Sequence, residues 1–194
     1  MFFSLSLLFS LFSLFAVLVG SLAANSINFV NQDGVLRTLI FTPNAGLEWL
    51  PSVDVPGHQE KNVTFPPMWC GNAYAVAEGA PIKPGMLAEF CFGNFDAMTF
   101  FDISAIVDPT DINGVKEMFP LSQLGLEVKV ADWYSGCKVF PCNTAYYAPD
   151  DPMTRASRET DFIVTLGTPD QITGVVPRED RAKAFDRKYV LGQA

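Results

Sequence analysis

The sequence predicts an all-β protein, an antiparallel β-sandwich of the kind built from two packed sheets. Short runs of alternating apolar and polar residues follow one another and are separated by turns rich in glycine, proline and asparagine. Little of the sequence after the first two dozen residues has the period of an amphipathic helix. The chain also contains 17 phenylalanines, several of them near the N-terminus, which suit a core of interlocking aromatic rings.

Residues 1–24 are predicted to be a secretory signal peptide, because they form an apolar run without Asp, Glu, Lys or Arg that ends in small residues. Cleavage after Ala23 places Ser21 and Ala23 at the usual positions, whereas cleavage after Ala24 places Leu22 at one of them. The run approaches the length that spans a bilayer, so an uncleaved anchor is the alternative. We expect a secreted protein, extracellular or in the cell wall, with one domain at 25–169 and a charged tail at 170–194. No membrane partner is expected once the signal is cleaved.

Four cysteines follow this signal, an even number that favours disulfides over a metal site. They allow three pairings. Cys137 and Cys142 flank a short loop, so we expect a local bridge there, which leaves Cys70 with Cys91. A zinc site is disfavoured because neither pair has the two-residue spacing and the single histidine, His58, lies far from both pairs.

The chain is acidic, with a net charge of -8, of which +2 belongs to the segment from Pro177 onwards and -10 to the rest. An acidic body repels phosphate backbones, so nucleic-acid binding is not expected. No motif implies a cofactor, and we expect a monomer. Asn62-Val63-Thr64 is the single glycosylation acceptor of the chain.

The first strand is predicted at Ser26–Asn31 and the second at Val35–Thr42, joined as an antiparallel hairpin by the turn residues Gln32-Asp33-Gly34. Pro43–Pro56 is expected to be a loop in which Trp49 is packed. Further strands are expected at Lys61–Phe65, Met68–Ala77, Gly125–Ala131 and Thr160–Gly167.

Pro109–Pro120 is expected to be irregular. A calcium loop is rejected there because Phe119 stands where the twelfth-position glutamate would be. Ala145–Pro152 is expected to be a turn with two adjacent acids. Arg178–Val190 is expected to form either a short peripheral helix or a frayed tail.

The stretch Met86–Asp108 is predicted to be two strands with a turn at Gly93–Ala97. In the first strand the period of two places Phe90 and Phe92 on one face and Glu89 and Cys91 on the other. Asp102 occupies the second strand within an aromatic run. We therefore interpret Glu89 and Asp102 as the floor of a site.

Two carboxyl groups across a cleft are the minimum for glycoside hydrolysis, with Asp108, Asp150 and Asp151 as further candidates beside Glu89 and Asp102. The alternatives are that these acids are simply solvated, or that they accept hydrogen bonds from sugar hydroxyls without chemistry. A Ser-His-Asp mechanism would have to use His58, which has no serine elbow nearby.

Three segments resemble the thaumatin-like, or pathogenesis-related group five, family. The first is Leu87-Ala88-Glu89-Phe90 followed by Phe100-Phe101-Asp102-Ile103-Ser104 and Val107-Asp108. The second is Ala145-Tyr146-Tyr147-Ala148-Pro149-Asp150-Asp151-Pro152, and the third is Asp161-Phe162-Ile163-Val164-Thr165. They occur in the family's order, and the likeness extends from about Asn25 to Pro169.

The resemblance implies an acidic cleft. Glu89, Asp102 and Asp150 match three of its acidic positions, and Asp108 matches the fourth with one residue inserted before it. Asn72 stands where the family has an arginine, so the cleft would lack its cation. Cys70 lies two residues before Asn72 and Cys91 two after Glu89, so a bridge between them would brace the cleft floor if those strands are neighbours.

The resemblance also implies that the family's second domain is compressed into 109–142. The Asn-Ser-Ile-Asn-Phe-Val-Asn start and the Asn-Gly-Val-Lys-Glu-Met segment are similar to a group of small secreted fungal proteins. Some of that group carry a deoxyribonuclease label, which the acidic body and single histidine do not support.

Three functions follow as hypotheses. The first is binding of a cell-wall polysaccharide, with β-1,3-glucan as the leading candidate, in the cleft formed by Asn72, Glu89, Asp102, Asp108 and Asp150. The second is an effector or surface antigen that acts through contacts with extracellular proteins. The third is a weak endo-β-1,3-glucanase with Glu89 as the acid and Asp102 as its partner.

Overall fold

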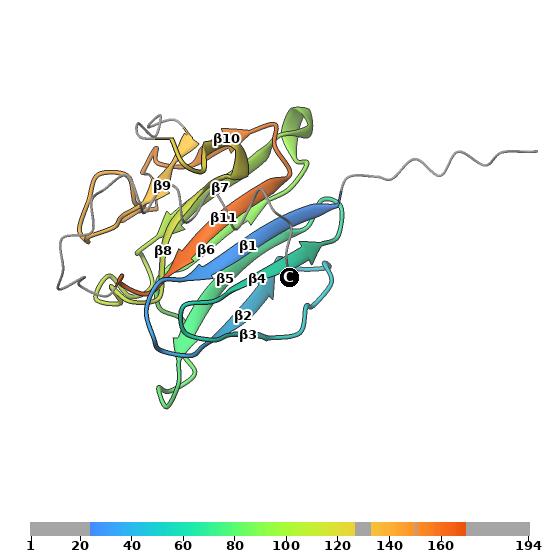
Figure 1. The fold of residues 1–194 in the computed structure, drawn as a ribbon. Coiled ribbons are helices and arrows are strands. Elements are labelled where there is room, and N and C mark those ends of the chain that lie inside the picture. The colour runs from blue at the N-terminus through green and yellow to red at the C-terminus, as the bar shows by residue number, and fades with distance from the viewer. Residues whose placement is uncertain (1–23, 127–132, 150, 170–194) are drawn as a thin grey trace, which may run out of the picture.

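The computed structural model describes residues 24–126, 133–149 and 151–169, which form two β-sheets packed face to face (Figure 1). This confirms the predicted all-β sandwich. The described residues contain two short 3-10 turns, η1 (Phe95–Ala97) and η2 (Leu121–Gln123), and no α-helix. Accordingly, no helix within the described part of the chain is long and apolar enough to cross a membrane.

One sheet has five strands, in the spatial order β4 (Glu60–Phe65), β1 (Asn25–Asn31), β11 (Asp161–Leu166), β8 (Val115–Pro120) and β9 (Ser135–Gly136). Its first and last strands in sequence, β1 and β11, pair in parallel, and the other neighbours pair antiparallel. Within the described residues, this parallel pair of strands departs from a purely antiparallel sandwich.

The other sheet has six strands, all antiparallel to their neighbours. Their spatial order is β10 (Arg155–Ser157), β7 (Thr99–Ser104), β6 (Leu87–Cys91), β5 (Cys70–Ala77), β2 (Arg37–Pro43) and β3 (Val53–Val55). The predicted central stretch is confirmed, because β6 and β7 are paired and the turn between them includes Gly93–Ala97.

The core between the sheets is aromatic, as the composition indicates. Phe65 lies at its centre, with the rings of Phe41, Trp69, Phe90 and Phe92 at centroid distances of 5.0–5.7 Å. Most of these contacts are edge-on or tilted, which suits the quadrupole of aromatic rings. Phe90 and Phe92 thus face the core, and Glu89 and Cys91 on the alternate face are half-buried.

The predicted hairpin between the first two strands is wrong, because β1 and β2 belong to different sheets. Each strand buries alternate residues, Ile27 and Phe29 on β1 and Leu39 and Phe41 on β2. Two such strands bury the same side chains whether they pair edge to edge or face one another across the core. The alternation in the sequence therefore does not distinguish the two arrangements.

Three local predictions are also wrong. Pro109–Pro120 is not irregular throughout, since β8 is a buried strand within the five-stranded sheet. Pro43–Pro56 contains the short strand β3, and Trp49 is 71% exposed. The tryptophan that packs in the core is Trp69.

Several predictions fall on residues outside the described ranges. They are the signal peptide up to Ala23, most of the strand expected at Gly125–Ala131, Asp150 and the charged tail with its expected helix. Gly125 itself lies in a turn. Asn62, the expected glycosylation site, is exposed on β4, the edge strand of the five-stranded sheet.

Candidate functional site

Asn72, Glu89 and Asp102 lie side by side on the outer face of the six-stranded sheet. In the register of β5, β6 and β7, Asn72 is opposite Glu89 and Glu89 is opposite Asp102. Their sequence neighbours Ala73, Ala88 and Ile103 are fully buried in the core, so the three polar side chains point away from it. We call these three residues the acidic row.

Asp102 is the most enclosed member of the acidic row, with 7% of its surface exposed. Its Oδ2 accepts a hydrogen bond from the Thr154 hydroxyl at 3.0 Å, while its Oδ1 is buried and accepts none. Burial and the charge of Glu89 raise the pKa of Asp102 to about 7. The hydrogen bond from Thr154 acts in the opposite direction.

Glu89 and Asp102 therefore form a pair of neighbouring carboxyl groups in which Asp102 keeps its proton to a higher pH than an ordinary aspartate. Thr154 donates a hydrogen bond to Asp102. Carboxylate oxygens accept hydrogen bonds from hydroxyl groups, and a protonated carboxyl group also donates one. This arrangement therefore suits recognition of hydroxyl groups.

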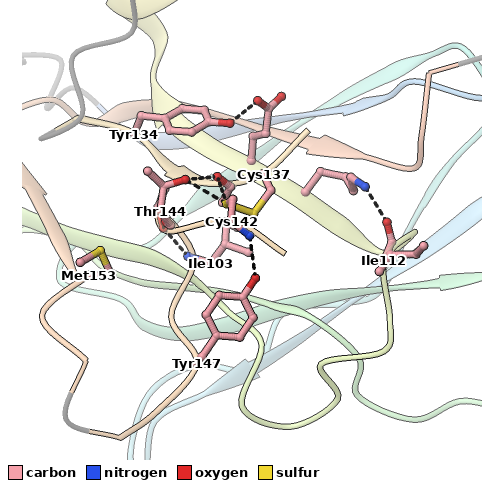
Figure 2. Close-up of a disulfide and its surroundings, with 12 residues drawn as sticks. Ile103, Ile112, Tyr134, Cys137, Cys142, Thr144, Tyr147 and Met153 are labelled. Carbon is pink, nitrogen blue, oxygen red and sulfur yellow. Dashed lines mark hydrogen bonds between the residues drawn. A yellow bond between two sulfur atoms is a disulfide. The ribbon is translucent and has the colours of Figure 1, made fainter. Parts of the chain in front are cut away.

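The loop closed by the disulfide Cys137–Cys142 holds the segment that supplies Thr154 beside β7. Cys137 and Cys142 are bonded to each other, and the Tyr147 hydroxyl accepts a hydrogen bond from the Cys142 backbone N–H at 3.2 Å (Figure 2). Ser135, just before this loop, accepts a hydrogen bond from Ile103 N at 2.8 Å through its hydroxyl. These contacts place the loop against the strand that carries Asp102.

The first disulfide, Cys70–Cys91, joins β5 and β6 on the outer face next to the acidic row. Both cysteines occupy the paired position two residues along the strands from Asn72 and Glu89. The structure thus contains both disulfides expected from the sequence, and one of them covalently fixes the strands that carry two of the three row residues.

Asp108 does not join the acidic row. Its carboxylate accepts hydrogen bonds from Thr110 and lies 3.4 Å from Lys83 Nζ, and these partners hold the pKa of Asp108 below its ordinary value. It lines a different pocket of about 270 Å³ between the loop after β5 and the loop after β7. None of the acidic-row residues lines that pocket.

The residues around the acidic row do not neutralise it. Asp151 is half-buried and accepts a hydrogen bond from Tyr147 N at 3.3 Å, and its charge also raises the pKa of Asp102. Arg155 follows Thr154 but donates through Nε to Tyr134 O at 3.3 Å. Asn72, opposite Glu89, contributes a neutral amide. No group of three metal-ligating side chains occurs within the described residues.

Thr154 is the site residue that sequence reasoning missed. It precedes β10, a strand of only three residues with no visible alternation, so nothing in the sequence places it against Asp102. The adjacent acids Asp150 and Asp151 did mark this segment, although Asp150 itself lies outside the described residues.

The fold and the site together define a class: a small, disulfide-bonded β-sandwich protein with two acidic side chains and one amide in a row across one sheet. The two disulfides fit export to an oxidising compartment. No family model matches the sequence.

A curated relative gives a closer assignment. The chain is 42% identical over 142 residues to the antigenic protein SchS21 of Stachybotrys chartarum. The match covers 73% of this chain and 94% of the relative. The protein therefore belongs to the same family as SchS21.

Proposed function

We propose that this is a secreted, thaumatin-like protein that binds a cell-wall polysaccharide along the acidic row, with β-1,3-glucan as the first candidate ligand. The observation that carries the proposal is the alignment of Asn72, Glu89 and Asp102 on three adjacent strands. The spacing between Glu89 and Asp102 in the sequence, and the order of the three side chains across the strands, also support the thaumatin-like assignment.

The chemistry of the acidic row favours a neutral, hydroxyl-rich ligand. Carboxylate oxygens accept hydrogen bonds from sugar hydroxyls, and the Asn72 amide both donates and accepts. The proton held by Asp102 allows that carboxyl group to donate as well. An anionic ligand is disfavoured because no cation faces Glu89 and Asp102 among the contacts described above, and the whole chain carries a net charge of -8.

A second candidate is a surface antigen or effector that acts through protein contacts. The name of the relative, an antigenic protein, favours it. In that case the acidic row would be one part of a protein interface. The weak glucanase remains an outcome to be tested.

Co-sedimentation with insoluble polysaccharide tests the proposal. The purified secreted protein is mixed with insoluble β-1,3-glucan, chitin or cellulose, and the bound fraction is measured. We expect selective retention on one polymer and loss of retention in the double variant Glu89→Ala/Asp102→Ala, because both carboxyl groups contact the ligand.

The matched control is Asp54→Ala/Glu78→Ala, which removes two exposed carboxyl groups from β3 and the loop after β5. This control should bind as the parent protein does. Equal retention of parent and Glu89→Ala/Asp102→Ala would exclude the acidic row as the binding site. Release of reducing ends that disappears in Glu89→Gln would favour the glucanase.

A further inference from the structure

Three large apolar side chains are exposed on adjacent loops at one end of the sandwich. They are Trp49 after β2, Met68 after β4 and Phe95 between β6 and β7, exposed by 71%, 64% and 80%. These loops lie at the same end of the two sheets (Figure 1). We call these three residues the apolar cap.

The three loops that carry the apolar cap are in contact with one another. Trp69, next to Met68, donates its indole N–H to Glu48 O at 2.9 Å and thereby joins the first two loops. Its carbonyl accepts a hydrogen bond from Phe92 N at 3.0 Å. A Cβ added to Gly93 would lie 3.9 Å from Met68 Cγ, so the second and third loops are also in contact.

Two of the three side chains lie on or beside residues with unfavourable backbone conformations. Met68 has a φ of 58°, and Asp96 and Ala97 beside Phe95 have φ values of 55° and 54°. Left-handed backbone is unfavourable for residues with a Cβ, and it persists where the surrounding structure imposes it. Asn94 caps Phe95 N at 2.8 Å, and Arg158 pairs with Asp96. These contacts hold the loop that carries Phe95.

The apolar cap is close to neutral within an acidic protein. The loops at 44–52, 66–69 and 92–98 contain only two charged residues, Glu48 and Asp96, and Asp96 is paired with Arg158. The whole chain carries -8. A neutral partner surface therefore complements the cap, and an anionic surface would be repelled by the rest of the molecule.

We propose that the apolar cap is a membrane-contact surface that inserts Trp49, Met68 and Phe95 into the interface of a neutral, zwitterionic bilayer. Tryptophan and phenylalanine partition into the headgroup boundary, and the strength of such binding follows the apolar area inserted. Large apolar side chains on separate loop tips suit a soft surface more than a rigid protein partner, which would need a matching set of pockets.

Vesicle flotation with the secreted protein and phosphatidylcholine vesicles tests the proposal. We expect binding that falls about tenfold in Trp49→Ser/Met68→Ser/Phe95→Ser, since most of the insertable apolar area is removed. The matched control, Ile82→Ser/Val139→Ser, replaces apolar residues that are 78% and 79% exposed on other loops and should bind as the parent does. Vesicles rich in phosphatidylserine should bind less of the parent protein.

A second measurement detects insertion by fluorescence quenching and does not depend on the triple variant. Brominated phosphatidylcholine should quench the tryptophan fluorescence of the parent protein, and Trp49→Phe should remove most of that quenching. Absence of both flotation and quenching in the parent would overturn the proposal, as would equal loss of flotation in the control variant. If the parent protein does not bind vesicles but forms a dimer that dissociates in the triple variant, the apolar cap is a contact with a second copy. If instead glucan retention is lost in the triple variant, the cap binds polysaccharide.

Discussion

Asp102 determines how the acidic row responds to pH. Its folded-state pKa of about 7 is above the ordinary value of 3.8, so the folded protein keeps a proton that the unfolded chain loses between those values. The unfolded state then binds fewer protons than the folded state, and stability falls as pH rises through this window. Below about pH 4 both states are protonated and this contribution to stability is complete.

Asp102→Asn should remove that pH dependence, because the amide stays neutral and can still accept a hydrogen bond from Thr154. The difference in free energy of unfolding, variant minus parent, should increase by at least about 1 kcal/mol from pH 4 to pH 8, since one unit of pKa corresponds to about 1.4 kcal/mol. Urea unfolding of both proteins at both pH values measures this difference. A difference between variant and parent that does not change with pH would contradict the assigned protonation.

Gly71, beside Asn72, is required for the close approach of β5 to β2. An added Cβ would lie 2.3 Å from Thr42 O and 2.7 Å from the Trp69 ring, so Gly71→Ala should displace backbone and cost about 2–3 kcal/mol. The matched variant Gly46→Ala has a positive φ of 87° but meets nothing within 4 Å, and should cost about 1 kcal/mol. Equal urea midpoints for the two variants would contradict this account.

At the scale of elements, the two disulfides differ in the length of chain they close. Cys70 and Cys91 are separated by 21 positions and Cys137 and Cys142 by 5. In the chain-entropy account, a bridge that closes a longer loop removes more freedom from the unfolded chain. The bridge between β5 and β6 should therefore contribute more to stability than the local bridge.

Replacing Cys70 and Cys91 by serine should cost about 3 kcal/mol, against about 2 kcal/mol for the same change at Cys137 and Cys142. Both variants remove one bridge and add two hydroxyl groups, so each serves as the control for the other. Denaturant unfolding under non-reducing conditions gives both values. A larger loss of stability in the Cys137–Cys142 variant would contradict this ranking. It would show that the contacts of the local loop with β7 contribute more to stability than the length of the closed loop.

At the scale of the whole molecule, the sequence was most informative where one face of a strand is apolar and the other polar. That pattern in β6 and β7 predicted both the strands and the outward direction of Glu89. It could not predict which sheet β2 joins, because edge pairing and facing across the core bury the same residues. It also could not reveal Thr154, whose relation to Asp102 depends on a contact 52 residues away along the chain.

β8 shows why a buried strand can be missed. Lys116 and Glu117 are both 2% exposed, although charged residues usually indicate solvent. Lys116 Nζ donates to Ile112 O at 2.6 Å and lies 5.0 Å from the centroid of the Phe140 ring. Glu117 accepts a hydrogen bond from the Tyr134 hydroxyl. Partners of this kind make burial of a charge tolerable, and Tyr134 and Phe140 lie too far along the chain for the sequence pattern to indicate them.

The acidic row as a polysaccharide site is tested most directly by nuclear magnetic resonance. The isotopically labelled secreted protein is titrated with a soluble β-1,3-gluco-oligosaccharide, with a cello-oligosaccharide of equal length as the control ligand. We predict saturable shifts of the backbone amides of Asn72, Glu89 and Asp102 and their strand neighbours with the first ligand. Shifts confined to other surfaces, or none at concentrations where the insoluble polymer retains the protein, would contradict the account.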